Sequence, residues 1–101
     1  MVQLNILSGK MAGTQWVARR FPVQIGRAAN SGLRLEENGV WDEHAQLNLD
    51  RLEGFLLKAH PNALVTVNNQ PVQTVRLRNG DSIALGAVRL QFWWVLPRTL
   101  V

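Results

Sequence analysis

Residues 82–94, SIALGAVRLQFWW, carry the pattern that decides the fold. Apolar residues alternate with other residues on both sides of Gly86, and this period of two is typical of a strand with one buried face. The same alternation recurs at 2–6, 21–25, 45–49 and 55–59, and short apolar runs follow at 64–67 and 75–77. Turns rich in glycine and asparagine separate these runs at intervals of roughly 8–12 residues, without a convincing amphipathic helix. The sequence therefore predicts an all-β sandwich or barrel.

Two asparagine-containing turns are expected to join neighbouring strands as hairpins. Asn79-Gly80, between residues 74–78 and 82–85, gives the stronger signal, because both residue types tolerate the positive φ of a two-residue hairpin turn. Asn68-Asn69 gives a weaker version of the same signal. The last apolar run, 91–97, is apolar on both faces and predicts a central core strand; the alternative is that Trp93 faces a partner.

Size and composition indicate one folded domain. The chain has 101 residues, of which 47% are hydrophobic and 18% charged, which excludes a disordered chain. We expect the domain at 1–96 and a tail at 97–101. The absence of cysteine excludes disulfides, thiolate zinc sites and a cysteine nucleophile. No apolar stretch approaches the roughly 18 residues of a membrane span, and the first residues lack the basic start of a signal peptide, so we expect a cytoplasmic domain.

The net charge of +4 is unevenly distributed. Six of the seven acids lie at 36–53, with basic residues before and after them. This pattern favours a solvated surface of both signs over a polyanion site. A nucleic-acid-binding domain is the disfavoured alternative, because its basic residues would be scattered without interleaved aromatic rings. It would use Arg19, Arg20, Arg76, Arg78 and Arg89.

The sequence offers little for catalysis. His44 and His60 are the only histidines and lack metal-ligand spacing, and neither a Gly-x-Ser-x-Gly elbow nor a phosphate loop is present. We expect no enzyme activity, metal or cofactor. Arg27, Asn30 and Ser31 form a polar group that suits a tetrahedral anion, although a polar loop that only completes a turn fits the spacing equally well.

Several motifs, in order, resemble the forkhead-associated (FHA) domain over about residues 4–95. They are Gly9 with Gly13, Ile25-Gly26-Arg27, VWDEHAQL at 40–47, Val67-Asn68-Asn69 and LRNGDSIALG at 77–86. The resemblance implies an FHA-type eleven-stranded antiparallel β-sandwich. It also implies a non-enzymatic protein-interaction module of signal transduction, whose loops at one end bind phosphothreonine peptides.

The resemblance assigns roles to individual positions. Arg27 matches the arginine that contacts the phosphopeptide, and His44 matches the histidine that supports the binding loops from within. Gly26 precedes that arginine, and Asn68 matches a later turn asparagine, although Asn69 replaces the glycine that usually follows. We expect His44 to be structural rather than catalytic.

Other positions depart from the family. Trp41 replaces the serine that hydrogen-bonds the phosphate, and Asp42 stands where arginine is usual. The family's Asn-Gly-Thr aligns on 63–65, so Asn62 replaces its asparagine only if the loop is shifted by one residue. The lost hydrogen bond is worth about 1.5–3 kcal/mol, and each carboxylate at 36, 37, 42 and 43 opposes a phosphate by about 0.5–3 kcal/mol at about 6–8 Å.

These departures predict a degenerate phosphothreonine site that binds a protein, peptide or second copy of the chain independently of phosphate. Trp41 would anchor the contact; alternatively, its ring covers the end of the core. Arg27 would contact the partner; alternatively, it fastens the loops to Asp42 or Glu43. The other possibility for the whole site is a working phosphothreonine reader that uses Arg27, Ser31 and Asn62.

Overall fold

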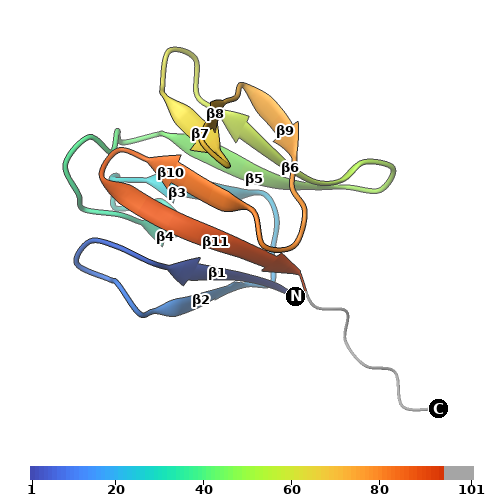
Figure 1. The fold of residues 1–101 in the computed structure, drawn as a ribbon, viewed down its shortest axis with the longest axis horizontal. Helices are drawn as coiled ribbons and strands as arrows, with labels where there is room; N and C mark the ends of the chain where they lie inside the picture. The colour runs from blue at the N-terminus through green and yellow to red at the C-terminus, as the bar shows by residue number, and fades with distance from the viewer. Residues whose placement is uncertain (95–101) are drawn as a thin grey trace.

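The structure is a computed structural model that describes residues 1–94, so the expected tail at 97–101 lies outside it. Residues 1–94 form eleven strands without a helix (Figure 1), so none of these residues belongs to a helix long and apolar enough to cross a membrane. The expected eleven-stranded, all-β fold is confirmed. The strands are β1 (Val2–Ile6), β2 (Gln15–Ala18), β3 (Val23–Gly26), β4 (Leu33–Arg34), β5 (Ala45–Asp50), β6 (Gly54–Ala59), β7 (Val65–Val67), β8 (Gln70–Pro71), β9 (Thr74–Arg76), β10 (Ser82–Leu85) and β11 (Val88–Trp94).

Two sheets pack into a sandwich. One sheet has the order β2-β1-β11-β10-β7-β8 and the other the order β4-β3-β5-β6-β9. All neighbouring strands are antiparallel except β3 and β4, which pair in parallel over only two residue pairs. The expectation of an antiparallel sandwich therefore holds apart from this short edge pair.

The core lies between the sheets and contains the inward-facing residues of the alternating runs. Leu4, Leu57 and Leu90 have no exposed surface. Phe55 of β6 meets Phe92 of β11 with ring centroids 5.6 Å apart, which joins the two sheets. Replacing such a leucine by alanine typically costs about 2–5 kcal/mol, so this core fixes the strands that carry the loops.

The Asn79-Gly80 hairpin prediction is wrong, because β9 pairs with β6 in one sheet while β10 pairs with β7 and β11 in the other. The segment between β9 and β10 crosses from sheet to sheet and is fastened to β11. The Gly80 N–H donates to the Phe92 carbonyl at 2.8 Å, and the Asn79 side chain accepts from the Trp94 N–H at 2.6 Å.

The Asn68-Asn69 hairpin prediction is confirmed. Both residues have positive φ, 50° and 67°, and they join β7 to β8 with Val67 opposite Gln70.

The β5–β6 turn is stabilised by a side chain. The Asp50 carboxylate accepts the backbone N–H groups of Glu53 and Leu52, and these two hydrogen bonds lower the pKa of Asp50.

The predicted central strand at 91–97 is described as far as Trp94, and residues 95–97 lie outside the structure. β11 is central, between β1 and β10, and its inner face is buried. Trp93 and Trp94 are 37% and 40% exposed, so the strand is not buried on both faces. The Trp93 indole N–H donates to the Gln91 side chain at 3.1 Å.

Candidate partner-binding loops

The strand pairing brings three loops to one end of the five-stranded sheet. β3 and β5 are antiparallel neighbours, so the loop after β3 (27–32) lies beside the loop before β5 (35–44). β5 and β6 are also antiparallel, so the loop after β6 (60–64) reaches the same end. We call these three segments the loop end. All predicted partner-contacting residues lie on them, whereas Asn68 lies elsewhere.

Gly26 lets the first two loops come into backbone contact. A Cβ at this position would lie 2.0 Å from the Asp42 carbonyl oxygen, a distance that no side chain tolerates. The Arg27 N–H donates to the Trp41 carbonyl at 2.8 Å, and the Ala28 N–H donates to the Asp42 carbonyl at 3.2 Å. The backbone of 27–28 is therefore held against that of 41–42.

His44 links the second and third loops from inside. Its side chain is 2% exposed; Nδ1 accepts the Trp41 N–H at 3.1 Å, and Nε2 lies 2.8 Å from the Leu64 carbonyl oxygen. The neutral ring with its proton on Nε2 satisfies both contacts, because Nδ1 then accepts and Nε2 donates. This geometry makes His44 a support of the loops.

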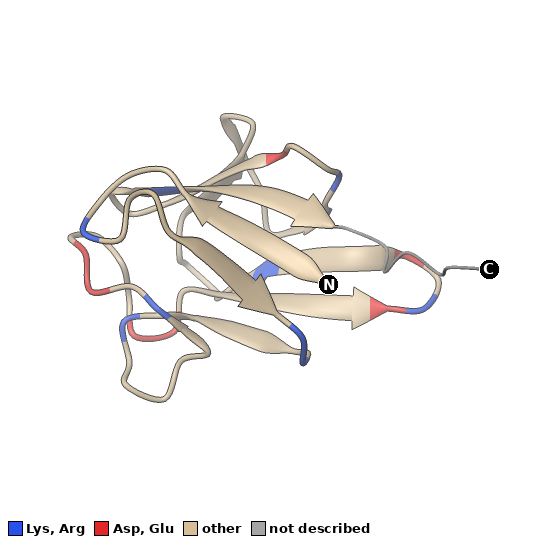
Figure 2. Cartoon of the chain, turned by 90° about the horizontal axis from the view of Figure 1, so that it is seen from below, with Lys and Arg blue, Asp and Glu red and all other residues tan. Residues whose placement is uncertain are grey.

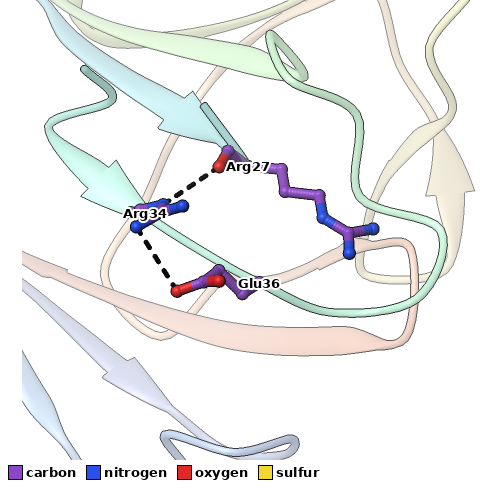
Figure 3. Close-up of polar contacts among 3 residues, drawn as sticks. All are labelled: Arg27, Arg34 and Glu36. Atoms are coloured by element: carbon purple, nitrogen blue, oxygen red, sulfur yellow. Dashed lines mark hydrogen bonds and ion pairs between the residues drawn. The ribbon is translucent and has the colours of Figure 1, made fainter. Parts of the chain in front are cut away.

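The Arg27 guanidinium forms no hydrogen bond or ion pair with any other residue between 1 and 94, and its side chain is exposed. Figure 3 shows it extending away from Arg34 and Glu36. Arg34 Nε instead donates to the Arg27 carbonyl at 3.1 Å, and Arg34 Nη1 lies 3.5 Å from the Glu36 carboxylate. The alternative in which Arg27 fastens the loops to Asp42 or Glu43 is not found in this structure.

Three of the four nearby carboxylates have partners of their own. Glu36 pairs with Arg34 as described, Glu37 accepts the Lys10 N–H, and Glu43 lies 3.6 Å from His60 Nε2. The Asp42 carboxylate has no such partner within residues 1–94. These contacts leave Arg27 and Asp42 as the unpaired charges among the positions singled out on the loops.

Trp41 lies at the surface of the loop end. Its residue is 46% exposed, and its ring centroid is 6.2 Å from that of His44, with the rings tilted by 54°. Its backbone N–H donates to the His44 ring, and its backbone carbonyl accepts the Arg27 N–H. The indole is therefore carried by a fixed backbone but remains accessible.

Asn62 carries the amide side chain of the third loop. It is exposed, and its φ is 68°. Ala63, the position aligned with the family's asparagine, is 7% exposed and thus faces inward. The side chains of Asn30, Ser31 and Asn62 have no hydrogen-bond partner in the part of the chain that the structure describes. They are free to contact a ligand.

Asn68 supports a different part of the fold. Its side chain donates to the Asp81 carboxylate at 2.9 Å and accepts the Ser82 N–H at 3.0 Å. It therefore ties the β7–β8 turn to the start of β10, away from the loop end.

A hollow that the sequence does not predict lies beside the loop end, on the five-stranded sheet. This cavity of about 250 Å³ is lined in part by Gln46, Lys58, His60 and the Glu43 side chain, and neither Arg27 nor Trp41 lines it. No sequence signal marked Lys58 or His60, because their proximity to Glu43 depends on strand register.

Comparison with known proteins agrees with the fold. The family model of the FHA domain matches residues 23–86. FhaA of Mycobacterium tuberculosis is 37% identical over 62 residues, which cover 61% of this chain and 12% of that protein. The glycogen accumulation regulator GarA of the same species is 28% identical over 89 residues, which cover 88% of this chain and 55% of GarA.

Solved structures extend the match to most of the chain. The FhaA FHA domain, complexed with the intracellular domain of Rv3910, superimposes with a TM-score of 0.80 at 30% identity and covers 92% of this chain and 100% of its own. A structure from work on phosphothreonine-dependent FHA domain interactions has a TM-score of 0.81 at 31% identity, with coverage of 95% and 98%. With its eleven-stranded sandwich and its match over residues 23–86, the chain belongs to the FHA domain family of protein-interaction modules.

Proposed function

We propose that this FHA domain is a non-enzymatic module that binds a protein partner at the loop end, with Trp41 as the anchor and without a requirement for phosphate on the partner. The observation that carries the proposal is the 46% exposure of an indole where the family has its phosphate-binding serine. Exposed tryptophans on a fixed backbone are frequent interface hot spots, because they bury a large area at little entropic cost.

The charges at the loop end also favour a partner without phosphate. A phosphothreonine carries a charge of about −1.5 to −2 and is best held by several cationic or N–H donors. Arg27 is one unpaired cation, and the unpaired Asp42 carboxylate follows Trp41 in the adjacent loop. Trp41 adds no hydroxyl, and His44 already accepts its backbone N–H, so the indole N–H is the one donor that residue 41 offers in place of the family's serine.

A phosphothreonine reader with a rearranged site is the second candidate. The free Arg27 guanidinium favours it, together with the unpartnered side chains of Ser31 and Asn62 on either side of the second loop. FHA domains of similar structure come from work on phosphothreonine-dependent interactions. This candidate requires Trp41 to leave room for the phosphate oxygens.

A paired peptide array distinguishes the two candidates. Random peptides with a central threonine are synthesised twice, with and without phosphate on that threonine, and probed with the wild-type chain, W41A and R27A. We expect the same sequences to bind in both forms, W41A to lose about tenfold or more in affinity, and R27A to retain most of it. Binders that disappear without phosphate and with R27A would instead establish the second candidate.

A further inference from the structure

β2 is an edge strand whose outer backbone groups have no hydrogen-bond partner among residues 1–94. It lies at the end of the six-stranded sheet, where β1 is its only neighbour among the strands of residues 1–94 (Figure 1). Both polar backbone groups of Ile6 point toward β2 and the turn before it, since its N–H donates to the Thr14 carbonyl and its carbonyl accepts the Gly13 N–H; the pair at Ile6 is therefore of the hydrogen-bonded kind. Because such pairs alternate along an antiparallel ladder, Trp16 bonds to β1, whereas the N–H and carbonyl groups of Gln15 and Val17 point away from it.

A hollow adjoins this free edge. Its volume is about 460 Å³, and it lies where β2 faces the start of β4 across the open side of the sandwich, lined by Trp16, Val17, Arg19, Arg20, Pro22 and Gly32 among others. Trp16 is partly buried against the core, and Val17 is 37% exposed. The hollow therefore has an apolar floor beside a row of free backbone donors and acceptors.

Two arginines stand at this hollow without a counter-charge. Arg19 and Arg20 are exposed and form no ion pair with any residue from 1 to 94, and no acidic residue lines the hollow. Figure 2 shows most of the acidic segments, in red, in the loops at one end of the sandwich and in the β5–β6 turn at the other. The local positive charge is thus left for a ligand.

We propose that β2 and this hollow form a second binding site, which takes an extended, acidic segment of a partner protein as an added strand. The partner backbone pairs with Gln15 and Val17, an apolar side chain enters the hollow, and carboxylates meet Arg19 and Arg20. Strand addition supplies affinity through backbone hydrogen bonds and specificity through alternate side chains. Guanidinium groups favour planar carboxylates, which selects an acidic sequence.

This site is separate from the loop end. No residue that lines the hollow forms a hydrogen bond, ion pair or ring contact with the Arg27 guanidinium or the Trp41 ring, so a strand can bind here whether or not the loop end requires phosphate. The shared element is the β3–β4 loop, which ends at Gly32.

The test uses a peptide of alternating valine and glutamate, capped at both ends, titrated into the ¹⁵N-labelled chain and followed by amide chemical shifts. We expect saturable shifts at Gln15, Val17 and Arg19. The R19E/R20E double variant should weaken binding by about tenfold or more. V17P should also abolish binding, because proline lacks the outward N–H that would pair with the peptide. The fold should be kept, because that N–H makes no bond to β1 and proline is tolerated at such positions of an edge strand.

Two controls are matched to these variants. R76E/R78E changes the net charge by the same amount at exposed positions that line no part of this hollow, and it should bind the peptide within about twofold of wild type. A valine–lysine peptide should not bind. The proposal is overturned if V17P binds normally, if the shifts fall on the loop end, or if a single-stranded oligonucleotide competes at Arg19 and Arg20 with higher affinity than the peptide.

Discussion

The identity of residue 41 decides which ligand chemistry the loop end can use. The Trp41 indole offers apolar surface to a partner but no hydroxyl group, and Asp42 beside it adds a negative charge. Arg27 is already free on the neighbouring loop, so the missing groups for phosphate binding are few.

Restoring those groups should create a phosphate site. In W41S/D42R, a hydroxyl and a second cation join Arg27, and each charge-assisted hydrogen bond is worth about 1.5–3 kcal/mol. We expect the affinity for phosphothreonine peptides, measured by calorimetry, to rise by about 100-fold or more. W41A/D42A is the control, because it removes the ring and the acid without adding a donor; equal affinities of the two double variants would contradict the account.

His44 should matter for stability rather than for chemistry. Replacing it by alanine leaves the Trp41 N–H and the Leu64 carbonyl without their partner and opens space in a buried position. We expect a loss of about 2–4 kcal/mol in the free energy of unfolding, measured with urea. His60 is the matched control: it is exposed, and H60A should change stability by less than about 0.5 kcal/mol. Similar losses of unfolding free energy in H44A and H60A would show that His44 does not support the loops.

Among the elements, the β7–β8 turn separates backbone conformation from side-chain contact. Asn68 and Asn69 both have positive φ, yet only Asn68 uses its side chain, with Asp81 and Ser82. Glycine accepts both backbone conformations. N69G should therefore leave the free energy of unfolding nearly unchanged, whereas N68G should lower it by about 1–2 kcal/mol, both measured by thermal unfolding. A larger loss from N69G than from N68G would contradict this division.

The sequence predicted long strands well and short ones poorly. Alternation identified most of the inner faces of β1, β5, β6 and β11, because one buried face imposes a period of two. Leu49 and Trp94, near the ends of β5 and β11, are exceptions with 54% and 40% exposure. β4 and β8 have two residues each and show no period. The turn at 79–80 was misinterpreted because local turn chemistry does not reveal whether the flanking strands share a sheet, which depends on the pairing of β9 with distant β6.

The loop end shows the same limit. The position of the loops followed from motifs around Gly26, Arg27 and His44. Whether the Arg27 guanidinium is free depends on where the nearby carboxylates find partners. Glu36 pairs with Arg34 two residues before it, whereas Glu37 and Glu43 find Lys10 and His60 in distant segments. Such long-range pairings leave no mark in the local sequence.

At the scale of the whole molecule, the sandwich holds two candidate contact surfaces on different sheets. The loop end belongs to the five-stranded sheet, whereas β2 is the edge of the six-stranded sheet. The core separates them, with contacts such as that of Phe55 with Phe92 between the two sheets. We therefore expect each surface to keep its affinity when the other is altered by substitution.

The most direct test of phosphate independence observes every backbone amide of the ¹⁵N-labelled chain while capped phosphothreonine is added, with capped threonine as the control. We expect no saturable shift at residues 27–31 or 41–44 below about 1 mM, which corresponds to a binding free energy weaker than about 4 kcal/mol. A saturable, micromolar response of the Arg27 and Ser31 amides to the phosphorylated compound alone would contradict it.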